Sequence, residues 1–291
     1  MPYKSIYRHD LFKDRNILVT GGGSGIGRCV AHELASLGAH VSIIGRKMEK
    51  LEAVAAEFEE DGYQLSLHSC DIREEDAVKS TIKEVVAQRG VIHGLVNNAG
   101  GQFPAPLTAI NQKGWETVIR TNLTGGFLVA KETYMQSMQK HGGAIVNIVA
   151  DMWGGMPGMG HSGAARAGMV NFTQTAAVEW GASGVRVNAI APGWIATSGM
   201  DTYPAHMKSW IRGLKDNVPL KRMGTESEVS SVICFLLSEG ANFISGDTVR
   251  IDGAASQGGR VWPLAKARNS ESYNGFHRAA TPQVLQEDSD K

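Results

Sequence analysis

The chain has 291 residues, with 29 basic and 29 acidic side chains and a formal net charge of zero. This length suits one large α/β domain or at most two, and the charge balance shows no basic excess that would favour nucleic acid or a membrane surface. No apolar run approaches the roughly 20 residues of a membrane span, and residues 1–13 lack a signal-peptide core. We therefore expect a cytoplasmic protein. The three cysteines lack metal-ligand spacing, so we expect no metal site.

A glycine-rich stretch follows the first predicted strand. Residues 16–19 form a mostly apolar run, and Val30, Leu34 and Leu37 then recur at helical spacing. Glycines between a strand and a helix permit positive φ and close approach of the backbone to a ligand, and the helix N-terminus attracts an anion. This context predicts a dinucleotide pyrophosphate site. The contacts expected in it are Gly21, Gly23, Ser24, Gly25, Ile26 and Gly27.

Strands and helices alternate along the rest of the chain. Alternation of this kind predicts a parallel sheet covered by helices on both faces. With right-handed connections between parallel strands, the predicted fold class is α/β, a single doubly wound parallel-sheet Rossmann domain. We assign residues 12–260 to this domain and residues 261–291 to a C-terminal tail, whose weakly patterned part is expected to order on a neighbouring subunit. The later predicted strands are 40–44, 65–70, 95–96, 144–149, 185–191 and 247–251, and the later predicted helices are 47–59, 72–86, 115–139, 164–179 and 226–237.

Ligands of such sheets bind at the carboxyl ends of the strands. Arg46 and Lys47 follow the second predicted strand, where an NAD-specific site would carry an acid for the ribose 2′-OH. The two cations indicate a clamp for a 2′-phosphate, with a solvated helix start as the alternative. Asp71 follows the third strand and suits either an adenine amino group or a helix cap. Further contacts expected at strand ends are Ile72, Asn98, Ala99 and Gly100.

Several motifs of the chain resemble, in order and spacing, those of the short-chain dehydrogenase/reductase family over roughly residues 12–253. They are residues 20–27, Asp71, residues 97–100, Asn122 and residues 192–193. The resemblance implies a nicotinamide cofactor, commonly a homotetramer, and an Asn122 that kinks a helix and holds a water. It also implies cofactor contacts at Pro192, Gly193 and Ile195.

A narrower resemblance is visible in four stretches. Residues 100–103, 113–115, 121–125 and 161–168 look like the peroxisomal trans-2-enoyl-CoA reductases. Dienoyl-CoA reductases share the broad layout. The resemblance implies an acyl-thioester substrate.

The chain departs from the family pattern at the usual catalytic positions. Ala150 stands in the place of the catalytic Ser, Ser162 in that of the Tyr, and Arg166 in that of the Lys. The enoyl-CoA reductases carry a second Tyr-x-x-x-Lys motif, but this chain has Val170 and Gln174 at the positions of its Tyr and Lys.

Other side chains would therefore handle the chemistry. We expect Arg166 to bond the nicotinamide ribose, because Arg keeps the positive charge of Lys. Either Asp151 or His161 would move the proton. Asp151 occupies about the place of a Tyr of the dienoyl-CoA reductases. Their alternative roles are a loop cap for Asp151 and a helix start for His161. Ser162 and Asn122 would bond the substrate carbonyl or a water.

Three functions remain open. The first is an NADP(H)-dependent oxidoreductase that reduces an enoyl-CoA or a related unsaturated carbonyl compound, since such a reaction depends less on an activated Tyr than alcohol oxidation does. The second is an alcohol or aldehyde dehydrogenase for branched isoprenoid compounds such as citronellol. The third is a nucleotide-binding protein without turnover, because fold alone does not decide activity.

Two surface features complete the analysis. The predicted helix 164–179 is apolar almost all round, which indicates cover by a second subunit in a homotetramer or by the chain's own tail. Residues 194–217 form a long connection with an apolar face. They are expected to be a substrate lid or an ordinary amphipathic helix on the body.

Overall fold

Seven parallel strands form one sheet in the computed structural model, which describes residues 2–203, 205–257, 263–267 and 269–286. The order is β3-β2-β1-β4-β5-β6-β7, so the strand order reverses between β1 and β4, where Val19 lies opposite Val96. Ligands of doubly wound sheets bind at such a reversal. The strands are β1 (Asn16–Thr20), β2 (His40–Gly45), β3 (Leu65–Ser69), β4 (Gly94–Asn97), β5 (Gly143–Ile148), β6 (Val185–Pro192) and β7 (Thr248–Ile251).

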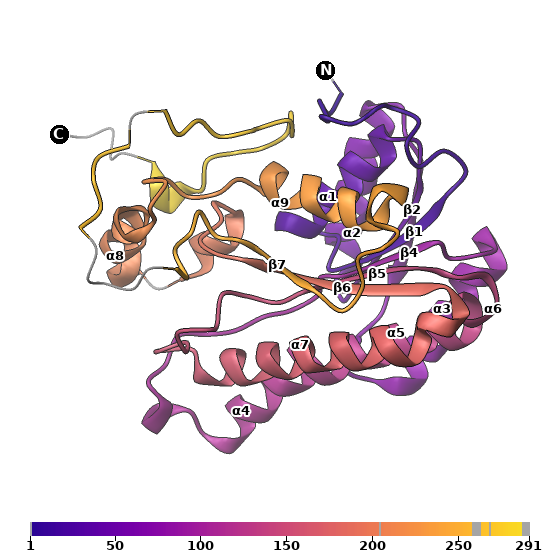
Figure 1. The fold of residues 1–291 in the computed structure, drawn as a ribbon, viewed down its shortest axis with the longest axis horizontal. Helices are drawn as coiled ribbons and strands as arrows, with labels where there is room; N and C mark the ends of the chain where they lie inside the picture. Colours follow the sequence, from indigo (N-terminus) through magenta and orange to yellow (C-terminus); the bar gives the residue numbers. More distant parts are fainter. Residues whose placement is uncertain (1, 204, 258–262, 268, 287–291) are drawn as a thin grey trace.

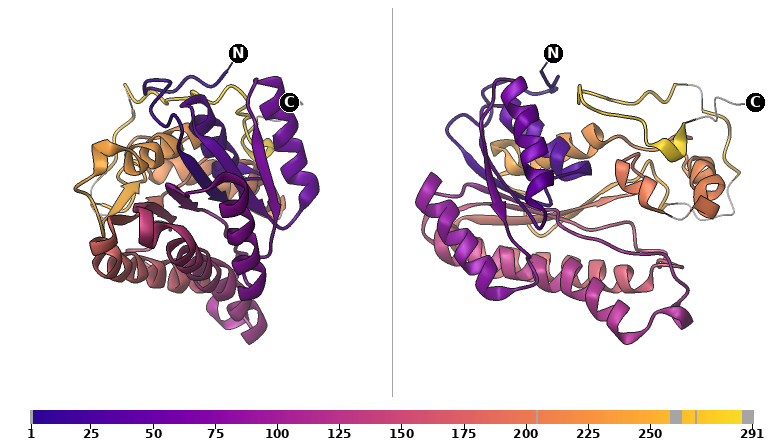
Figure 2. Two further views of the ribbon diagram at one scale, coloured as in Figure 1. Left: turned by 90° about the vertical axis from the view of Figure 1, so that its right-hand side faces the viewer. Right: turned by 180° about the vertical axis from the view of Figure 1, so that it is seen from behind.

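Helices cover both faces of the sheet (Figure 1; Figure 2). The helices α1 (Gly25–Ser36), α2 (Met48–Glu60) and α9 (Glu226–Leu237) enclose one apolar core. The helices α3 (Glu75–Arg89), α5 (Gly125–Thr133) and α7 (Gly160–Trp180) enclose the other, with α4 (Gln112–Ile119) on the same side. The predicted α/β fold class is therefore confirmed. Within the described ranges, no helix combines the length and the apolar character that crossing a bilayer requires.

The predicted long helix 115–139 is a composite. The helices α4, α5 and α6 (Gln139–His141) follow one another through two π-helical turns, Arg120–Thr124 and Tyr134–Met138. Such turns insert an extra residue and are frequent at functional sites. The first one contains the buried Asn122, at the position where the resemblance implies a kink.

The connection 194–217 contains several short helices instead of one amphipathic helix. The helix α8 (Lys208–Gly213) lies among the 3₁₀ turns Ser198–Thr202, Ala205–Met207 and Leu214–Asn217. Met200, Ile211 and Leu214 pack with Val284 of the tail in a small separate core. Part of the apolar face expected of this connection therefore packs against the tail.

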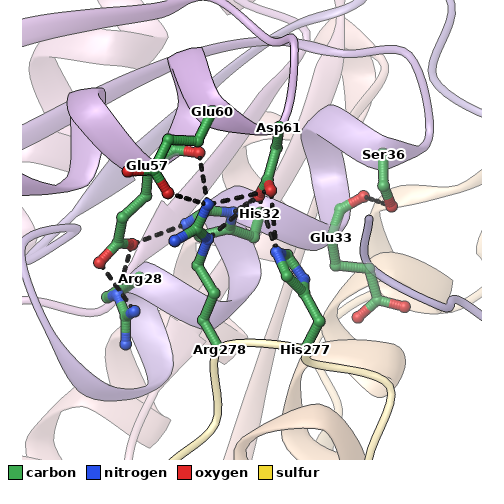
Figure 3. A network of polar contacts seen from close by, with 9 residues as sticks. All are labelled: Arg28, His32, Glu33, Ser36, Glu57, Glu60, Asp61, His277 and Arg278. Carbon is green, nitrogen blue, oxygen red and sulfur yellow. Dashed lines mark hydrogen bonds and ion pairs between the residues drawn. The ribbon is translucent and has the colours of Figure 1, made fainter. Parts of the chain in front are cut away.

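The tail packs on its own chain, which corrects the expectation that it orders on a neighbour. The Lys4 N–H donates to the Gly275 carbonyl (2.9 Å), and Phe276 is buried in a stacked contact with Tyr3. Arg278 and His277 pair with Asp61 at the end of α2 (Figure 3). The buried Phe276 ring and the ion pairs with Asp61 attach the tail to the body of the domain. The weak local sequence pattern of the tail did not predict these contacts. The described tail lies on the side of the sheet opposite α7, so it does not cover that helix (Figure 1).

Candidate active site

The loop between β1 and α1 has the backbone that its glycines require. Gly21 and Gly25 have positive φ angles of 67° and 56°. A methyl group on Gly27 would lie 2.4 Å from the Gly21 carbonyl oxygen, and one on Gly21 would lie 2.8 Å from the Asn98 amide nitrogen. The loop therefore folds tightly against the first turn of α1, whose N-terminus suits a phosphate. Gly23, Ser24 and Ile26 lie in the same loop and turn.

The loop after β4 is tied to the glycine loop. The Thr20 hydroxyl oxygen accepts from the backbone N–H groups of Asn98 and Ala99, both at 2.9 Å. The Asn98 side chain donates back to the Thr20 carbonyl at 2.9 Å. These bonds join the ends of β1 and β4 into one surface at the reversal of strand order. Asn98, Ala99 and Gly100 are thus placed beside the predicted pyrophosphate site.

The ends of β2 and β3 carry an ion pair and two exposed cations. Arg46 and Lys47 are exposed at the start of α2. The Arg73 guanidinium donates to the Asp71 carboxylate (2.9 Å from Nε to Oδ1) and holds the pKa of Asp71 below its ordinary value. Sequence reasoning missed Arg73, although it lies only two positions after Asp71. Ile72 is buried between them.

A cleft of about 720 Å³ opens at the carboxyl ends of the strands. It brings together predicted residues from the glycine loop, the loop after β4, α7 and the end of β6, and also residues for which no site role was predicted. Predicted site residues that line it are Ile26, Asn98, Gly100, Arg166, Pro192, Gly193 and Ile195. Four more, Trp194, Thr197, Met200 and Tyr203, belong to the connection 194–217 that was expected to be a substrate lid, whereas Gln102 and Phe103 had no predicted role. Asn122, Asp151, His161 and Ser162 are not among its lining residues, nor are Arg46, Lys47, Asp71 and Ile72.

Arg166 is the buried cation of the cleft. Its Nη1 donates to the Ile148 carbonyl at 2.6 Å, and burial lowers its pKa to about 10. The Nε atom is buried and has no hydrogen-bond partner among the described residues. A methyl group on Gly100 would lie 2.5 Å from Nη2, so the guanidinium lies against the loop after β4. A buried cation with an unpaired donor beside a glycine-lined cradle fits the ribose hydroxyls of a nicotinamide dinucleotide.

The loop 100–102 is held from two sides. The Asn122 side-chain oxygen accepts from the Gly101 N–H at 2.8 Å, and the Asn122 Nδ2 is buried without a partner in the described structure. Ser162 is fully buried, and its hydroxyl donates to the Gln102 side-chain oxygen at 2.7 Å. Ser162 therefore lies behind Gln102, which lines the cleft in its place. The residues 100–103 were singled out as a pattern, but no role had been predicted for Gln102.

Asp151 and His161 lie outside the cleft lining. Burial and the negative charge of Asp252 raise the pKa of the Asp151 carboxyl. The His161 ring is fully buried against Phe103, with ring centroids 4.5 Å apart. Its Nδ1 accepts from the Ser162 backbone N–H at 2.8 Å, in the first turn of α7. This bond matches the alternative role of His161 at a helix start. The described residues hold no cluster of His, Cys, Asp and Glu side chains suited to a metal ion.

The reversal in strand order, the glycine loop and the cleft above it are the features of a dinucleotide-binding α/β domain. Residues 21–256 match the family model described as enoyl-(acyl carrier protein) reductase. The chain belongs to the short-chain dehydrogenase/reductase family, whose members bind a nicotinamide cofactor.

Particular relatives include reductases of acyl thioesters and a dehydrogenase. A probable 2,4-dienoyl-CoA reductase of Bacillus subtilis is 39% identical over 81% of this chain and 94% of its own length. A peroxisomal 2,4-dienoyl-CoA reductase of Danio rerio is 34% identical over 87% of this chain and 85% of its own. Among solved structures, a citronellol catabolism dehydrogenase of Pseudomonas aeruginosa PAO1 is 65% identical, with a TM-score of 0.80 over 88% of this chain and 100% of the other.

Proposed function

We propose that this oxidoreductase uses NADP(H) to reduce the conjugated double bond of an enoyl thioester or a related unsaturated carbonyl compound. The observation that carries the proposal is a cleft lined by the buried Arg166 and by apolar side chains, in a chain that has Ala150 and Ser162 at the positions of the Ser and Tyr used for alcohol oxidation. The dienoyl-CoA reductases among the relatives support it.

The wall of the cleft suits an acyl chain. Aromatic and aliphatic surface in its lining comes from Phe103, Trp194, Ile195, Met200 and Tyr203. Binding sites of this kind combine a mostly apolar wall with a few polar groups that fix orientation.

Bound NADPH would supply the hydride. Arg166 would hold the ribose by charge-assisted hydrogen bonds and place a positive charge near the reacting atoms. Because Arg stays protonated at neutral pH, it stabilises charge and does not relay a proton.

The preference for NADP(H) is attributed to the exposed Arg46 and Lys47, which stand where an acid would contact the 2′-OH of NAD. A hydrogen bond to a charged group contributes about 1.5–3 kcal/mol, so Arg46→Asp should lose about tenfold or more of the preference for NADPH over NADH. Lys4→Asp, at an exposed position near the N-terminus, serves as the control. Equal affinity of the wild type for NADH and NADPH in a fluorescence titration would refute the assignment.

A second candidate, a dehydrogenase for branched isoprenoid alcohols or aldehydes, is based on the 65% identity to the citronellol catabolism dehydrogenase. The two functions are separated by one paired assay. NADPH oxidation is followed with trans-2-enoyl-CoAs, and NADP⁺ reduction is followed with citronellol. Turnover of citronellol alone selects the second function. If NADPH binds but no substrate in either direction is turned over, the protein is a nucleotide-binding member without activity.

We further propose a cytoplasmic homotetramer. One face of α7 is exposed, with Val178 at 83% exposure, and Phe127 and Met135 on the preceding helical segment are also exposed. Apolar side chains that gather on neighbouring helices commonly mark a contact with another subunit.

A further inference from the structure

We propose that residues 282–286 of the tail act as a brace that fixes the connection 194–217 and so holds the apolar wall of the cleft in place for the substrate. Val284 and Asp201 are the positioning residues of this brace. The inference rests on the proposed function in one respect, that the cleft takes a substrate with an apolar part. The match to the family model ends at residue 256, so the family pattern assigns no role to the brace.

The wall of the cleft and the tail share one set of apolar contacts. Trp194, Met200 and Tyr203 of the connection line the cleft. The same three side chains belong to the small separate core in which Val284 is buried, with 2% of its surface exposed. The tail therefore supplies part of the support on which this wall of the cleft rests.

Hydrogen bonds also hold the backbone around Val284 against two parts of the connection. The Val284 N–H donates to the Asp201 Oδ1 atom at 2.8 Å, in the 3₁₀ turn Ser198–Thr202. Arg212 of α8 donates from Nε to the Val284 carbonyl at 2.8 Å and from Nη2 to the Gln286 carbonyl at 2.7 Å. Both backbone groups of Val284 are thereby engaged, and the tail joins this turn to α8.

The brace is a short folded unit that is anchored to the body of the domain. Residues Gln283–Leu285 form a 3₁₀ turn, and the Gln286 side chain donates back to the Thr281 carbonyl at 2.9 Å. Arg278, which is paired with the end of α2, lies six positions before Val284 (Figure 3). Six residues span at most about 20–22 Å. The distance by which the connection can move from the body is limited while both attachments hold.

The connection depends on such support because its helical elements are short. The helix α8 has six residues and the turn Ser198–Thr202 has five, and helices of this length are not stable in water by themselves. Met200 links the brace to the ligand, since it both lines the cleft and packs with Val284. Loss of the contact with Val284 should loosen Met200 and weaken binding of an apolar chain, because a mobile wall must be ordered when the ligand binds.

The test measures the order of the connection separately from ligand binding. Order is measured as amide hydrogen exchange, by mass spectrometry of peptides from residues 198–203 and 207–214. The ligand is 2-decanone, which has an alkyl chain and a carbonyl group and which NADP⁺ cannot oxidise. Its Kd in the presence of NADP⁺ is measured by quenching of tryptophan fluorescence, since Trp194 lines the cleft.

The variants separate the brace from a general loss of stability. Asp201→Ala removes the acceptor of the Val284 N–H, whereas Asp201→Asn keeps an acceptor oxygen and is the rescue variant. Val284→Ala removes two methyl groups from the small separate core. Val78→Ala removes the same groups from a similarly buried valine in α3, with 1% of its surface exposed. Asp76→Ala, at an exposed position, controls for the loss of a surface charge.

We expect exchange in both stretches to accelerate about 3- to 10-fold in Asp201→Ala, the range of one net hydrogen bond. In Val284→Ala the acceleration should be about tenfold or more, because a cavity adds to the lost contacts. The Kd for 2-decanone should rise about 3- to 10-fold in both variants. Asp201→Asn and Asp76→Ala should match the wild type, and Val78→Ala should lower the Tm without either change.

Unchanged exchange in Val284→Ala, or an equal acceleration in Val78→Ala, overturns the brace. Faster exchange with an unchanged Kd for 2-decanone overturns its role in holding the cleft wall. If the wild type binds no 2-decanone and turns over neither an enoyl-CoA nor citronellol, the proposed function fails, and the exchange measurements alone decide whether the brace stands.

Discussion

Replacement of Arg278 by alanine tests how the C-terminal tail is held. The Arg278 guanidinium donates to both carboxylate oxygens of Asp61, at 3.0 and 3.2 Å, and to the carboxylate of Glu60 at 2.9 Å (Figure 3). The Asp61 side chain is only 7% exposed, whereas that of Glu60 is 68% exposed. The contact with Asp61 therefore accounts for most of the expected effect.

The magnitude follows from these exposures. A well-oriented hydrogen bond to a charged and largely buried group contributes about 1.5–3 kcal/mol, and an exposed ion pair contributes about 0–1 kcal/mol. Arg278→Ala should consequently lower the free energy of unfolding by about 2–3 kcal/mol. For a domain of this size such a loss corresponds to a fall in Tm of about 4–10 °C.

The loss should depend on pH in a defined direction. Burial opposes ionisation of Asp61, but hydrogen bonds from Arg278 and His277 outweigh it and hold the pKa of the carboxyl below its ordinary value. A carboxyl with a depressed pKa stabilises the fold above its unfolded pKa of about 3.9 and stops doing so as the pH falls through the folded pKa. The deficit of Arg278→Ala should thus be constant from about pH 5 to pH 8 and shrink below about pH 4.

The measurement is thermal unfolding at several pH values, together with limited proteolysis of the tail. The control is Arg8→Ala, which removes an exposed pair with Asp10 whose side chains are 69% and 55% exposed. Should Arg278→Ala melt at the same temperature as Arg8→Ala, and its tail resist protease equally, the reasoning about this attachment is refuted.

Three further results are expected. Burial raises the pKa of Glu226 to about 7, so wild-type stability should fall as the pH rises through the interval from its unfolded pKa to about 7, and Glu226→Gln should remove this slope in urea midpoints. Val178→Glu, at an exposed position on α7, should dissociate the expected tetramer in light scattering, and a monomeric wild type would contradict the assembly. Gly27→Ala should weaken NADPH binding at least about tenfold, as expected when a methyl 2.4 Å from the Gly21 oxygen displaces the phosphate loop. Gly181→Ala, where a methyl meets no heavy atom within 4 Å, should not.

The sheet and the nucleotide loop could be predicted from the sequence because their signals are local. Apolar runs, helical spacing and glycines at a strand end each depend on residues within one element or one turn. The predicted helix 226–237 coincides with α9, and the predicted strands lie within two residues of β1 to β7 at each end. The rule that parallel strands end at one edge predicted that Asn98 and Pro192 lie near one another, and the structure has both in the lining of one cleft.

Contacts between distant residues were decided only by the tertiary structure. Ser162 and Gln102 are 60 positions apart, and Asp61 and Arg278 are 217 positions apart, so no periodic pattern relates them. Such pairs depend on the register in which helices and loops pack, and a side-chain hydrogen bond tolerates an error of only a few tenths of an ångström. The sequence alone therefore determined the fold class and the glycine loop between β1 and α1 of this protein. Packing decided that Gln102 stands in the cleft in front of Ser162 and that the tail closes on its own α2, because these arrangements depend on distances that exist only once the chain is folded.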